Sequence, residues 1–469
     1  MDQNKDKAFC KIFRHHLDLE TDLLKQWFEE ENFTVDELQA GSELEFFLLD
    51  KHFKPLPKNL EFIKSVNQPF VIPEVGAAHL EINSGHFNLT DNCLSQLHEN
   101  ILSYWNICQN ETKKNNCHIA MLGTLPTATL QHHQIKFLTK KKRYALIDKR
   151  LHDFNEDEGI SVEINGNETL SLQPSSLAIN GLLSAFQIHI QIGLKESVRF
   201  YNAAQAIAGP VLAMSCNSPF LFSHSICHES RIFIFDEVMT LRNFNNNKNF
   251  KCCLFGSNYL KHSFFELFKE NLSFPCLVPQ ALPQPLENMY HVRKQNGVVY
   301  RWNRPVIDFN DAHKPHLRIE FRAPSSGPTV IDMIATTALF YGLLYYYTNC
   351  VVQPIEEVLL FKQARKNFYN AARYGMDCEF GWMNDKNIKA TALLTELLPL
   401  ARKGLMALGI SFADIHLYLG IIESRIKAKM NGSNWQLLFI EKYGNDYNAM
   451  LEIYLQNQST EQPVSTWKL

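Results

Sequence analysis

The ten residues of Gly41–Asp50, GSELEFFLLD, constrain the fold more than any other part of the sequence. Successive side chains of a β-strand point to opposite faces, so Glu43 and Glu45 project together. Leu44 and Phe46 then face the other way. Two neighbouring carboxylates repel each other and resist burial. A mostly apolar strand that keeps both of them indicates a cation, or a cationic substrate, beside the sheet.

Length and charge describe a globular chain with a large core. The 469 residues are 45% hydrophobic and 20% charged, with a formal net charge of -3. This balance gives no support for bulk electrostatic binding to nucleic acid or to an anionic membrane, so we expect neither partner. Eleven cysteines without a C-x-x-C spacing, and a charged MDQNKDK start, predict free thiols and no secretory signal. We therefore expect a cytoplasmic protein.

One apolar run, Val330–Val352, is long enough to raise the question of a membrane span. It contains Asp332 and Asn349 and three consecutive tyrosines. Polar groups of this kind favour a buried helix over a membrane-spanning one.

The order of the elements predicts an α+β protein with an antiparallel sheet and a C-terminal helical layer. Residues 1–40 are expected to be a helical lead-in, residues 41–329 a catalytic sheet domain, and residues 330–469 a helical portion packed on the same domain. There is no internal repeat, no G-x-G-x-x-G and no Walker loop. The helices expected in the last part are Val330–Val352, Glu357–Tyr374, Ile388–Ala407, His416–Lys429 and Asn434–Gln456.

Several local expectations concern the middle of the chain. A helix over Glu196–Ala208 is expected to end before Pro210. Arg231–Phe235 is a candidate for a short strand, and the asparagine-rich Asn243–Asn249 for a loop. The basic run Lys140–Arg143, KKKR, is interpreted as a solvated helix face, with contact to a phosphate as the alternative.

Four polar groups in strand-like contexts could carry chemistry. They are Glu43 with Glu45, Glu74 with Glu81, His189, and the alternating Arg318, Glu320 and Arg322. Alone, each has an ordinary structural interpretation: a wet strand face, a core histidine, a surface ladder of ion pairs. Together they favour one site of carboxylates, imidazole and guanidinium groups. Carboxylates suit Mg²⁺ or Mn²⁺, and arginines suit phosphates, so we expect phosphoryl transfer from a metal nucleotide.

The chain resembles the glutamine synthetase / glutamate–cysteine ligase superfamily, and most closely the carboxylate–amine ligases of the second glutamate–cysteine ligase family. The matching segments occur in family order over most of the chain. They are Glu43-Leu44-Glu45, Glu74–Glu81, His189–Gly193, Asn217–Phe220 followed by Arg231, Trp302–Pro305, Arg318–Arg322 and Ala371–Gly375. The resemblance implies a glutamine synthetase-like domain with a curved, mainly antiparallel sheet packed by helices.

The resemblance also implies a carbon–nitrogen ligase that uses ATP and Mg²⁺ (or Mn²⁺). In that family ATP phosphorylates a carboxylate, usually the γ-carboxylate of glutamate, and an amine attacks the acyl phosphate. The residues implied are Glu45, Glu74 and Glu81 for one metal ion; Glu43, His189 and Glu320 for another; Arg304, Arg318 and Arg322 for catalysis; and Arg231, Arg322 and Arg373 for the nucleotide.

Departures from the family pattern leave alternatives open. Gln191 stands where the family often has a second histidine, and Ser223–Ser230 forms a different loop. The amine, the identity of the acid and the oligomeric state are open; the apolar helices after Thr329 could also form a homodimer. The competing functions are another phosphotransfer on the same scaffold, such as a guanidino kinase, and a catalytically inactive binding protein.

Overall fold

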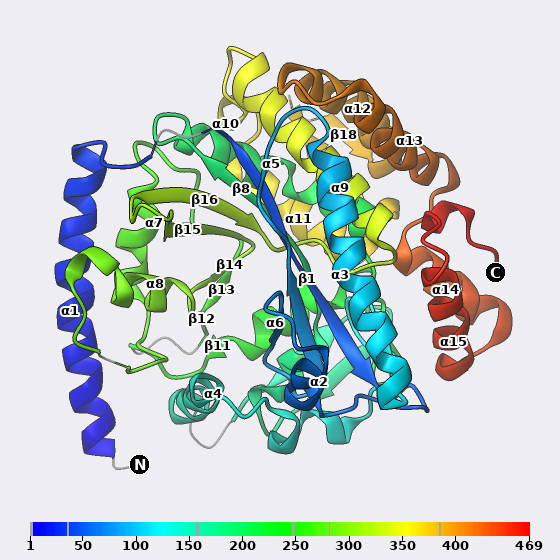
Figure 1. The fold of residues 1–469 in the computed structure, drawn as a ribbon, viewed down its shortest axis with the longest axis horizontal. Coiled ribbons are helices and arrows are strands. Elements are labelled where there is room, and N and C mark those ends of the chain that lie inside the picture. Colours follow the sequence, from blue (N-terminus) through cyan, green and yellow to red (C-terminus); the bar gives the residue numbers. More distant parts are fainter. Residues whose placement is uncertain (1–2, 35–36, 156–158, 246–248, 281, 384–385) are drawn as a thin grey trace.

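The centre of the molecule is an eight-stranded sheet (Figure 1). The computed structural model describes residues 3–34, 37–155, 159–245, 249–280, 282–383 and 386–469. The strand order is β15-β16-β8-β1-β3-β2, and β4 and β5 also pair with β1. All of these pairs are antiparallel, which confirms the predicted sheet. The strands are β1 Gln39–Leu49, β2 Val71–Pro73, β3 His79–Asn83, β4 Phe87–Asn88, β5 His118–Ala120, β8 Phe186–Ile192, β15 Asn303–Phe309 and β16 Pro315–Phe321.

Side-chain alternation gives this sheet one apolar face and one polar face. Helices α3 (Cys93–Asn115), α5 (Ser197–Ser215) and α9 (Val330–Tyr345) contact the apolar face. There Phe46 lies 5.5 Å from the ring of Trp105, and Phe321 stacks on Phe340 with ring centroids 4.6 Å apart. The charged residues of β1, β8 and β16 lie on the opposite face, which leaves that face for the site.

The apolar run that begins at Val330 is a core helix. Helix α9 continues into a short π-helical segment, Tyr346–Cys350. Within the described residues, Val330–Cys350 is the one helix long and apolar enough to cross a membrane, and 83% of its most apolar window is buried inside the structure. Its burial against the sheet and neighbouring helices explains the apolar composition.

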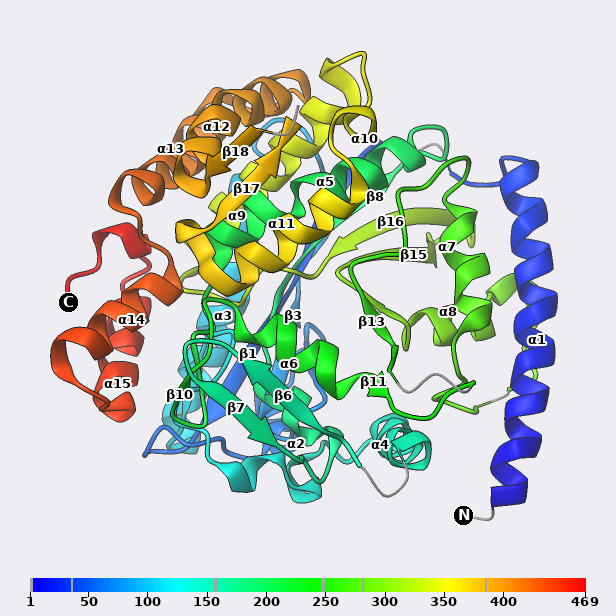
Figure 2. The same ribbon diagram turned by 180° about the vertical axis from the view of Figure 1, so that it is seen from behind.

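The C-terminal helices lie at the edge of the molecule opposite helix α1 (Figures 1 and 2). Helix α1 packs on α7 and α8. The remaining elements are α1 Gln3–Glu29, α2 Asn59–Val66, α4 Lys142–Asn155, β6 Val162–Asn165, β7 Thr169–Leu172, β9 Phe220–Leu221, β10 His224–Ser225, α6 Ser230–Val238, β11 Thr240–Leu241, β12 Phe250–Lys251, β13 Cys253–Leu254, α7 Phe265–Glu270, α8 Tyr290–Asn296, β14 Tyr300–Arg301, α10 Ile355–Val358, α11 Phe361–Tyr374, β17 Glu379–Trp382, β18 Lys386–Lys389, α12 Ala390–Ala407, α13 Phe412–Ala428, α14 Gly432–Tyr443 and α15 Tyr447–Gln458.

Two of the local predictions were wrong. Helix α5 does not end before Pro210 but continues to Ser215. From Phe200 onward every residue of that helix is buried, and packing offsets the cost of one missing hydrogen bond, about 3 kcal/mol. The segment Arg231–Phe235 is part of helix α6, not a strand, because a short apolar alternation fits either element and tertiary packing decides.

Other boundaries shifted. Asn434–Gln456 is two helices, α14 and α15, separated at Gly444, whose φ of 84° suits glycine. The start of the predicted helix at Ile388 instead belongs to the β17–β18 hairpin. The loop predicted at Asn243–Asn249 is neither helix nor strand in its described part, and residues 246–248 lie outside the described residues. The division at residues 40 and 329 stays a prediction.

Candidate functional site

Strand register brings three predicted residues into one group on the polar face. His189 on β8 lies opposite Glu320 on β16, and Glu43 on β1 lies opposite Gln187, two residues from His189. One ligand atom from each of Glu43, His189 and Glu320 lies within 4.8 Å of the other two. The Nε2 atom of His189 is 3.5 Å from Glu43 Oε1 and 3.8 Å from Glu320 Oε2. The sheet therefore presents two carboxylates and one imidazole to a single point.

The imidazole of His189 is buried and neutral. Burial lowers its pKa to about 3, although the carboxylate of Glu320 opposes that shift. Its Nε2 atom is buried without a hydrogen-bond partner among the described residues. A buried polar atom without a partner is costly, and a neutral imidazole beside carboxylates is a metal-ligand set. The donor set therefore fits a divalent cation.

Glu320 is held as an anion by two arginines. Arg304 donates to Glu320 Oε2 from Nε at 3.0 Å and from Nη2 at 2.5 Å, and Arg322 donates to Oε1 from Nη1 at 2.8 Å. Burial would raise the pKa of Glu320, but the two guanidinium groups prevail and lower it to about 2. The carboxylate is ionised and fixed in direction, as a ligand or a positioning group requires.

Glu43 has the opposite electrostatic state. Burial and then the charge of Glu320 raise the pKa of Glu43 to about 8, against the smaller effect of Arg304. In the absence of a cation this carboxyl therefore keeps its proton at neutral pH. His189 is neutral, so Glu43, His189 and Glu320 supply no positive charge at the point where their oxygen and nitrogen atoms converge.

A second set of carboxylates lies on the same sheet, with Glu45 on β1, Glu81 on β3 and Glu74 directly after β2. Glu45 and Glu81 are opposite each other on β1 and β3, and Gln187 donates to Glu45 Oε1 at 2.7 Å and to Glu81 Oε2 at 3.5 Å. Burial, and then repulsion by neighbouring carboxylates, raises the pKa of Glu81 well above its usual range and also raises that of Glu74. Among the residues that the structure describes, Glu45, Glu74 and Glu81 do not lie as close together as Glu43, His189 and Glu320 do.

His79 supports Glu45 and was missed by the sequence analysis. Its Nε2 atom lies 3.4 Å from Glu45 Oε2, and its ring stacks on Phe47 at 5.3 Å. With the backbone N–H of Ala185 at 2.7 Å, these contacts lower the pKa of Glu45 although burial opposes them. The alternation of strand β3, which places His79 and Glu81 on one face, could have identified it.

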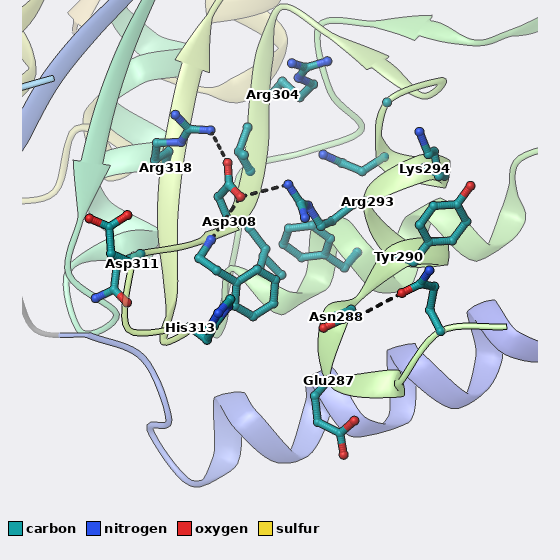
Figure 3. Close-up of a pocket in the computed structure, with 18 of the residues that line it drawn as sticks. Glu287, Asn288, Tyr290, Arg293, Lys294, Arg304, Asp308, Asp311, His313 and Arg318 are labelled. Carbon is teal, nitrogen blue, oxygen red and sulfur yellow. Dashed lines mark hydrogen bonds and ion pairs between the residues drawn. The ribbon is translucent and has the colours of Figure 1, made fainter. Parts of the chain in front are cut away.

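Arg318 turns toward a residue that the sequence analysis did not select. It lies opposite Gln191 in the sheet, and its Nη2 atom donates to Asp308 Oδ2 at 3.1 Å. Asp308 also accepts from Arg293 Nη2 at 2.8 Å (Figure 3). Arg318 is therefore part of a network at the edge of the sheet rather than a direct partner of Glu320.

Arg231 and Arg373, predicted for the nucleotide, have partners other than the proposed metal ligands, although Arg231 lines a small cavity together with Glu45 and Arg322. Arg231 is buried, pairs with Glu229 at 3.0 Å and donates to the backbone carbonyls of Arg322 and Ala323, so it supports the segment that follows β16. Arg373 donates to the Asn165 carbonyl. A nucleotide contact stays a prediction for both residues.

Two cavities adjoin the group. One of about 270 Å³ is lined by Gly41, His189, Gln191 and Arg318 among others. A larger one of about 940 Å³ lies between strand β15 and helix α8 and includes Arg304 and Arg318 (Figure 3). Of the basic run KKKR, Lys140, Lys141 and Lys142 are exposed, as the interpretation of a solvated face predicts, whereas Arg143 is half-buried in the wall of this cavity. Arg143 lies in the first turn of α4, and the start of that helix borders the cavity.

Comparison with known proteins identifies one matching family. The model of the glutamate–cysteine ligase family 2 matches residues 39–436. No curated protein matches this chain. Among solved structures, a glutamate–cysteine ligase from Francisella tularensis in complex with AMP aligns over 93% of this chain and 91% of its own, with TM-score 0.53 and 9% identity.

A bifunctional glutathione synthetase from Pasteurella multocida is also similar. The alignment covers 95% of this chain and 55% of that one, with TM-score 0.53 and 9% identity. At such identities the similarity concerns the fold, and it confirms the expected glutamine synthetase-like α+β architecture.

Proposed function

The chain belongs to the glutamate–cysteine ligase family 2, and from that membership we propose that it is an ATP- and Mg²⁺-dependent carboxylate–amine ligase. The observation that carries the proposal is the convergence of Glu43, His189 and Glu320 beside two arginines on one sheet face. Carboxylates, a neutral imidazole and guanidinium groups are what a metal nucleotide needs.

The proposed metal ligands follow from the donor set at the first position and from the family resemblance at the second. Glu43, His189 and Glu320 would hold one Mg²⁺, and Glu45, Glu74 and Glu81 a second. Bound there, the metal would supply charge neutralisation and Lewis-acid activation of a phosphoryl oxygen. The Nε2 atom of His189, which has no hydrogen-bond partner among the described residues, and the raised pKa of Glu43 both support a cation at the first position.

The protein's own residues would position the reactants. Arg304 and Arg322 hold Glu320 and present further N–H groups on the polar face, where they can bind the transferring phosphoryl group or a substrate carboxylate. A carboxylate oxygen of the acid would attack the γ-phosphorus and ADP would leave. The amine nitrogen would then attack the acyl carbon, with inorganic phosphate as the leaving group. Orientation and electrostatic preorganisation would lower both barriers.

The finer assignments are also proposals. The acid is proposed to be glutamate, activated at its γ-carboxylate, and the partner a small amine; Gln191 in place of a second histidine leaves cysteine as one candidate amine among several. The cytosol is the proposed location, because all 11 cysteines lie in the described part of the chain and none forms a disulfide. A homodimer is a further expectation, which light scattering would test.

ADP release measured with Mg²⁺-ATP, glutamate and a panel of amines tests the function. We expect release that depends on both the acid and one of the amines, with an amide product detected by mass spectrometry. The Glu43→Gln variant is the control for contaminating ATPase activity. Release without any amine, with a stable phosphorylated product, would instead identify a kinase, and nucleotide binding without turnover an inactive binding protein.

A further inference from the structure

The larger cavity beside the carboxylate group has a cationic wall. Five cationic side chains line it against three acidic ones, and its volume is about 940 Å³. Figure 3 shows Arg293, Lys294 and Tyr290 on helix α8 facing the strand that carries Arg304 and Asp308. The lining cations are Arg143, Arg293, Lys294, Arg304 and Arg318. A cavity of this size holds a ligand comparable to a nucleotide.

Two of the five cations have no carboxylate partner within the described ranges. Arg293 and Arg318 share Asp308, and Arg304 is bound to Glu320. Arg143 donates to the backbone carbonyl of Gly297 at 2.8 Å, which satisfies a hydrogen bond without neutralising the charge.

Lys294 is the other uncompensated cation. Its ammonium lies 5.4 Å from the ring centroid of Tyr290. Burial and then the charges of Arg143 and Arg293 lower the pKa of Lys294. Repelling cations gathered around a cavity favour an anionic ligand, because its binding removes the repulsion.

Helix α1 holds the short helix that carries this wall. Glu20 is fully buried and accepts from the backbone N–H groups of His291 at 2.7 Å and Val292 at 2.9 Å. Its other oxygen lies 2.6 Å from His291 Nδ1. These donors belong to the first turn of α8, whose N–H groups have no partner within the helix. Glu20 therefore helps to fix the position of α8 relative to α1, together with the ring contacts of Phe13 and His16 to His291.

Helix α1 is also bonded to the segment that follows α7. Arg14 donates to the carbonyls of Leu272 and Phe274, at 2.5 Å and 2.9 Å. The described part of α1 ends at Glu29, before the family match begins at residue 39. Helix α1 thus lies outside the segment that the family model covers, whereas α8 lies within it.

We propose that Arg143 and Lys294 form a subsite for the phosphate chain of the nucleotide, and that Glu20 is the positioning residue that holds α8 at this subsite. The inference rests on the proposed function, since it assumes that the nucleotide lies beside Glu320. Arg304 connects the proposed subsite with the carboxylate group, because it lines the cavity and contacts Glu320. A phosphate chain offers several anionic oxygens, to which two uncompensated cations can donate charge-assisted hydrogen bonds.

Calorimetric binding of inorganic tripolyphosphate, ATP and adenosine tests the subsite. For Lys294→Met we expect tripolyphosphate and ATP to bind at least about tenfold more weakly, while adenosine binds unchanged. Lys427→Met, on the surface of α13, is the matched control with no expected effect. Because binding needs no turnover, the result is readable even if no ligase activity is found.

Two outcomes would overturn the subsite. One is unchanged tripolyphosphate affinity in Lys294→Met. The other is a loss confined to the acid substrate, seen as a raised KM for the acid with normal binding of ATP and tripolyphosphate.

The Glu20→Gln variant tests the positioning role, with Glu29→Gln as the control on the exposed end of the same helix. We expect a several-fold weaker affinity for tripolyphosphate and a raised KM for ATP, with kcat within about twofold of the wild type. Glu29→Gln should change neither. A Glu20→Gln protein that melts at a lower temperature but binds tripolyphosphate normally would show that Glu20 is structural only.

Discussion

Glu43 and Glu320 face the same imidazole but differ in their electrostatic state. Glu320 has two arginine partners, which lower its pKa to about 2, whereas burial and Glu320 itself raise the pKa of Glu43 to about 8. Its surroundings stabilise the ionised form of Glu320, whereas those of Glu43 destabilise its ionised form. The same substitution at the two positions should therefore have different effects on stability.

Glu320→Gln should lose both activity and stability. It leaves Arg304 and Arg322 without their shared carboxylate, and breaking a buried ion pair costs on the order of 3–5 kcal/mol. Glu43→Gln should lose activity yet keep or raise stability in the metal-free protein, because it removes a repelled carboxyl. Urea unfolding with EDTA, beside the ADP assay, measures both. Equal destabilisation by the two variants would contradict this assignment.

The contribution of Glu43 to the stability of the metal-free protein should fall as pH rises from about 4.5 to about 8, whereas that of His189, whose folded pKa is lowered to about 3, should rise as pH rises from about 3 to about 6.5. In that window the unfolded chain has lost the Glu43 proton while the folded chain still holds it, so the folded state is disfavoured as pH rises. Glu320 acts in the opposite direction, because its stabilisation is lost as pH falls from about 4.5 to about 2.

Urea unfolding with EDTA at a series of pH values measures this dependence. As pH rises from about 4.5 to about 8, Glu43→Gln should gain stability relative to the wild type by on the order of a few kcal/mol, because the variant lacks the contribution of Glu43. A profile for Glu43→Gln parallel to that of the wild type would assign the dependence to other groups.

At the scale of elements, the helical layer depends on close backbone contact between α9 and α12. Gly342 and Gly404 meet where these helices cross, and a Cβ on either would overlap the backbone of the other helix. Gly404→Ala should therefore destabilise the protein by about 1–3 kcal/mol, in spite of the higher helix propensity of alanine. Thermal and urea unfolding measure the effect.

Gly420 in α13 is the matched control. A Cβ there would have no heavy atom within 4 Å outside its own chain neighbours and helix turns. Gly420→Ala should stabilise by up to about 1 kcal/mol, as expected for an unhindered helical position. If Gly404→Ala stabilised the protein as Gly420→Ala does, helices α9 and α12 could move apart without a cost in stability.

At the scale of the whole molecule, residues 330–469 complete the core rather than form an appendage. Tyr341 on α9 donates to the carbonyl of His189 at 2.6 Å, and Phe340 stacks on Phe321. The site strands β8 and β16 thus rest on a helix that follows them in sequence. Asp332 and Arg425, 3.6 Å apart and both buried, tie α9 to α13.

A fragment of residues 1–329 should consequently fail to fold. Without α9 the apolar face of the sheet would be exposed to water, at a cost of roughly 25 cal/mol for each Å² of apolar surface. Near-UV circular dichroism and urea titration would show no native signal and no cooperative transition. A cooperative transition in the fragment would mean that the sheet domain is independent of the C-terminal helices.

The sequence by itself determined the strands of the site. Alternation placed Glu43 and Glu45, the residues around His189, and Arg318 to Arg322 on strand faces, because the strand period is a local property. The ordered motifs determined the family as well. The long apolar helix at Val330 was likewise predicted as buried, from the polar residues within it.

Only the tertiary structure decided which of these residues meet. Strand register made Arg304 a partner of Glu320, and the same strand pair placed Arg318 beside Asp308. Packing carried α5 through Pro210 and made a helix of Arg231–Phe235. The cationic wall of the cavity brings together Arg143 on α4 and Lys294 on α8, which are more than 100 residues apart in sequence. Local sequence patterns give the periodicity and charge of each segment. The pKa values and the cavities depend on long-range pairing and burial, which exist only once the chain has folded.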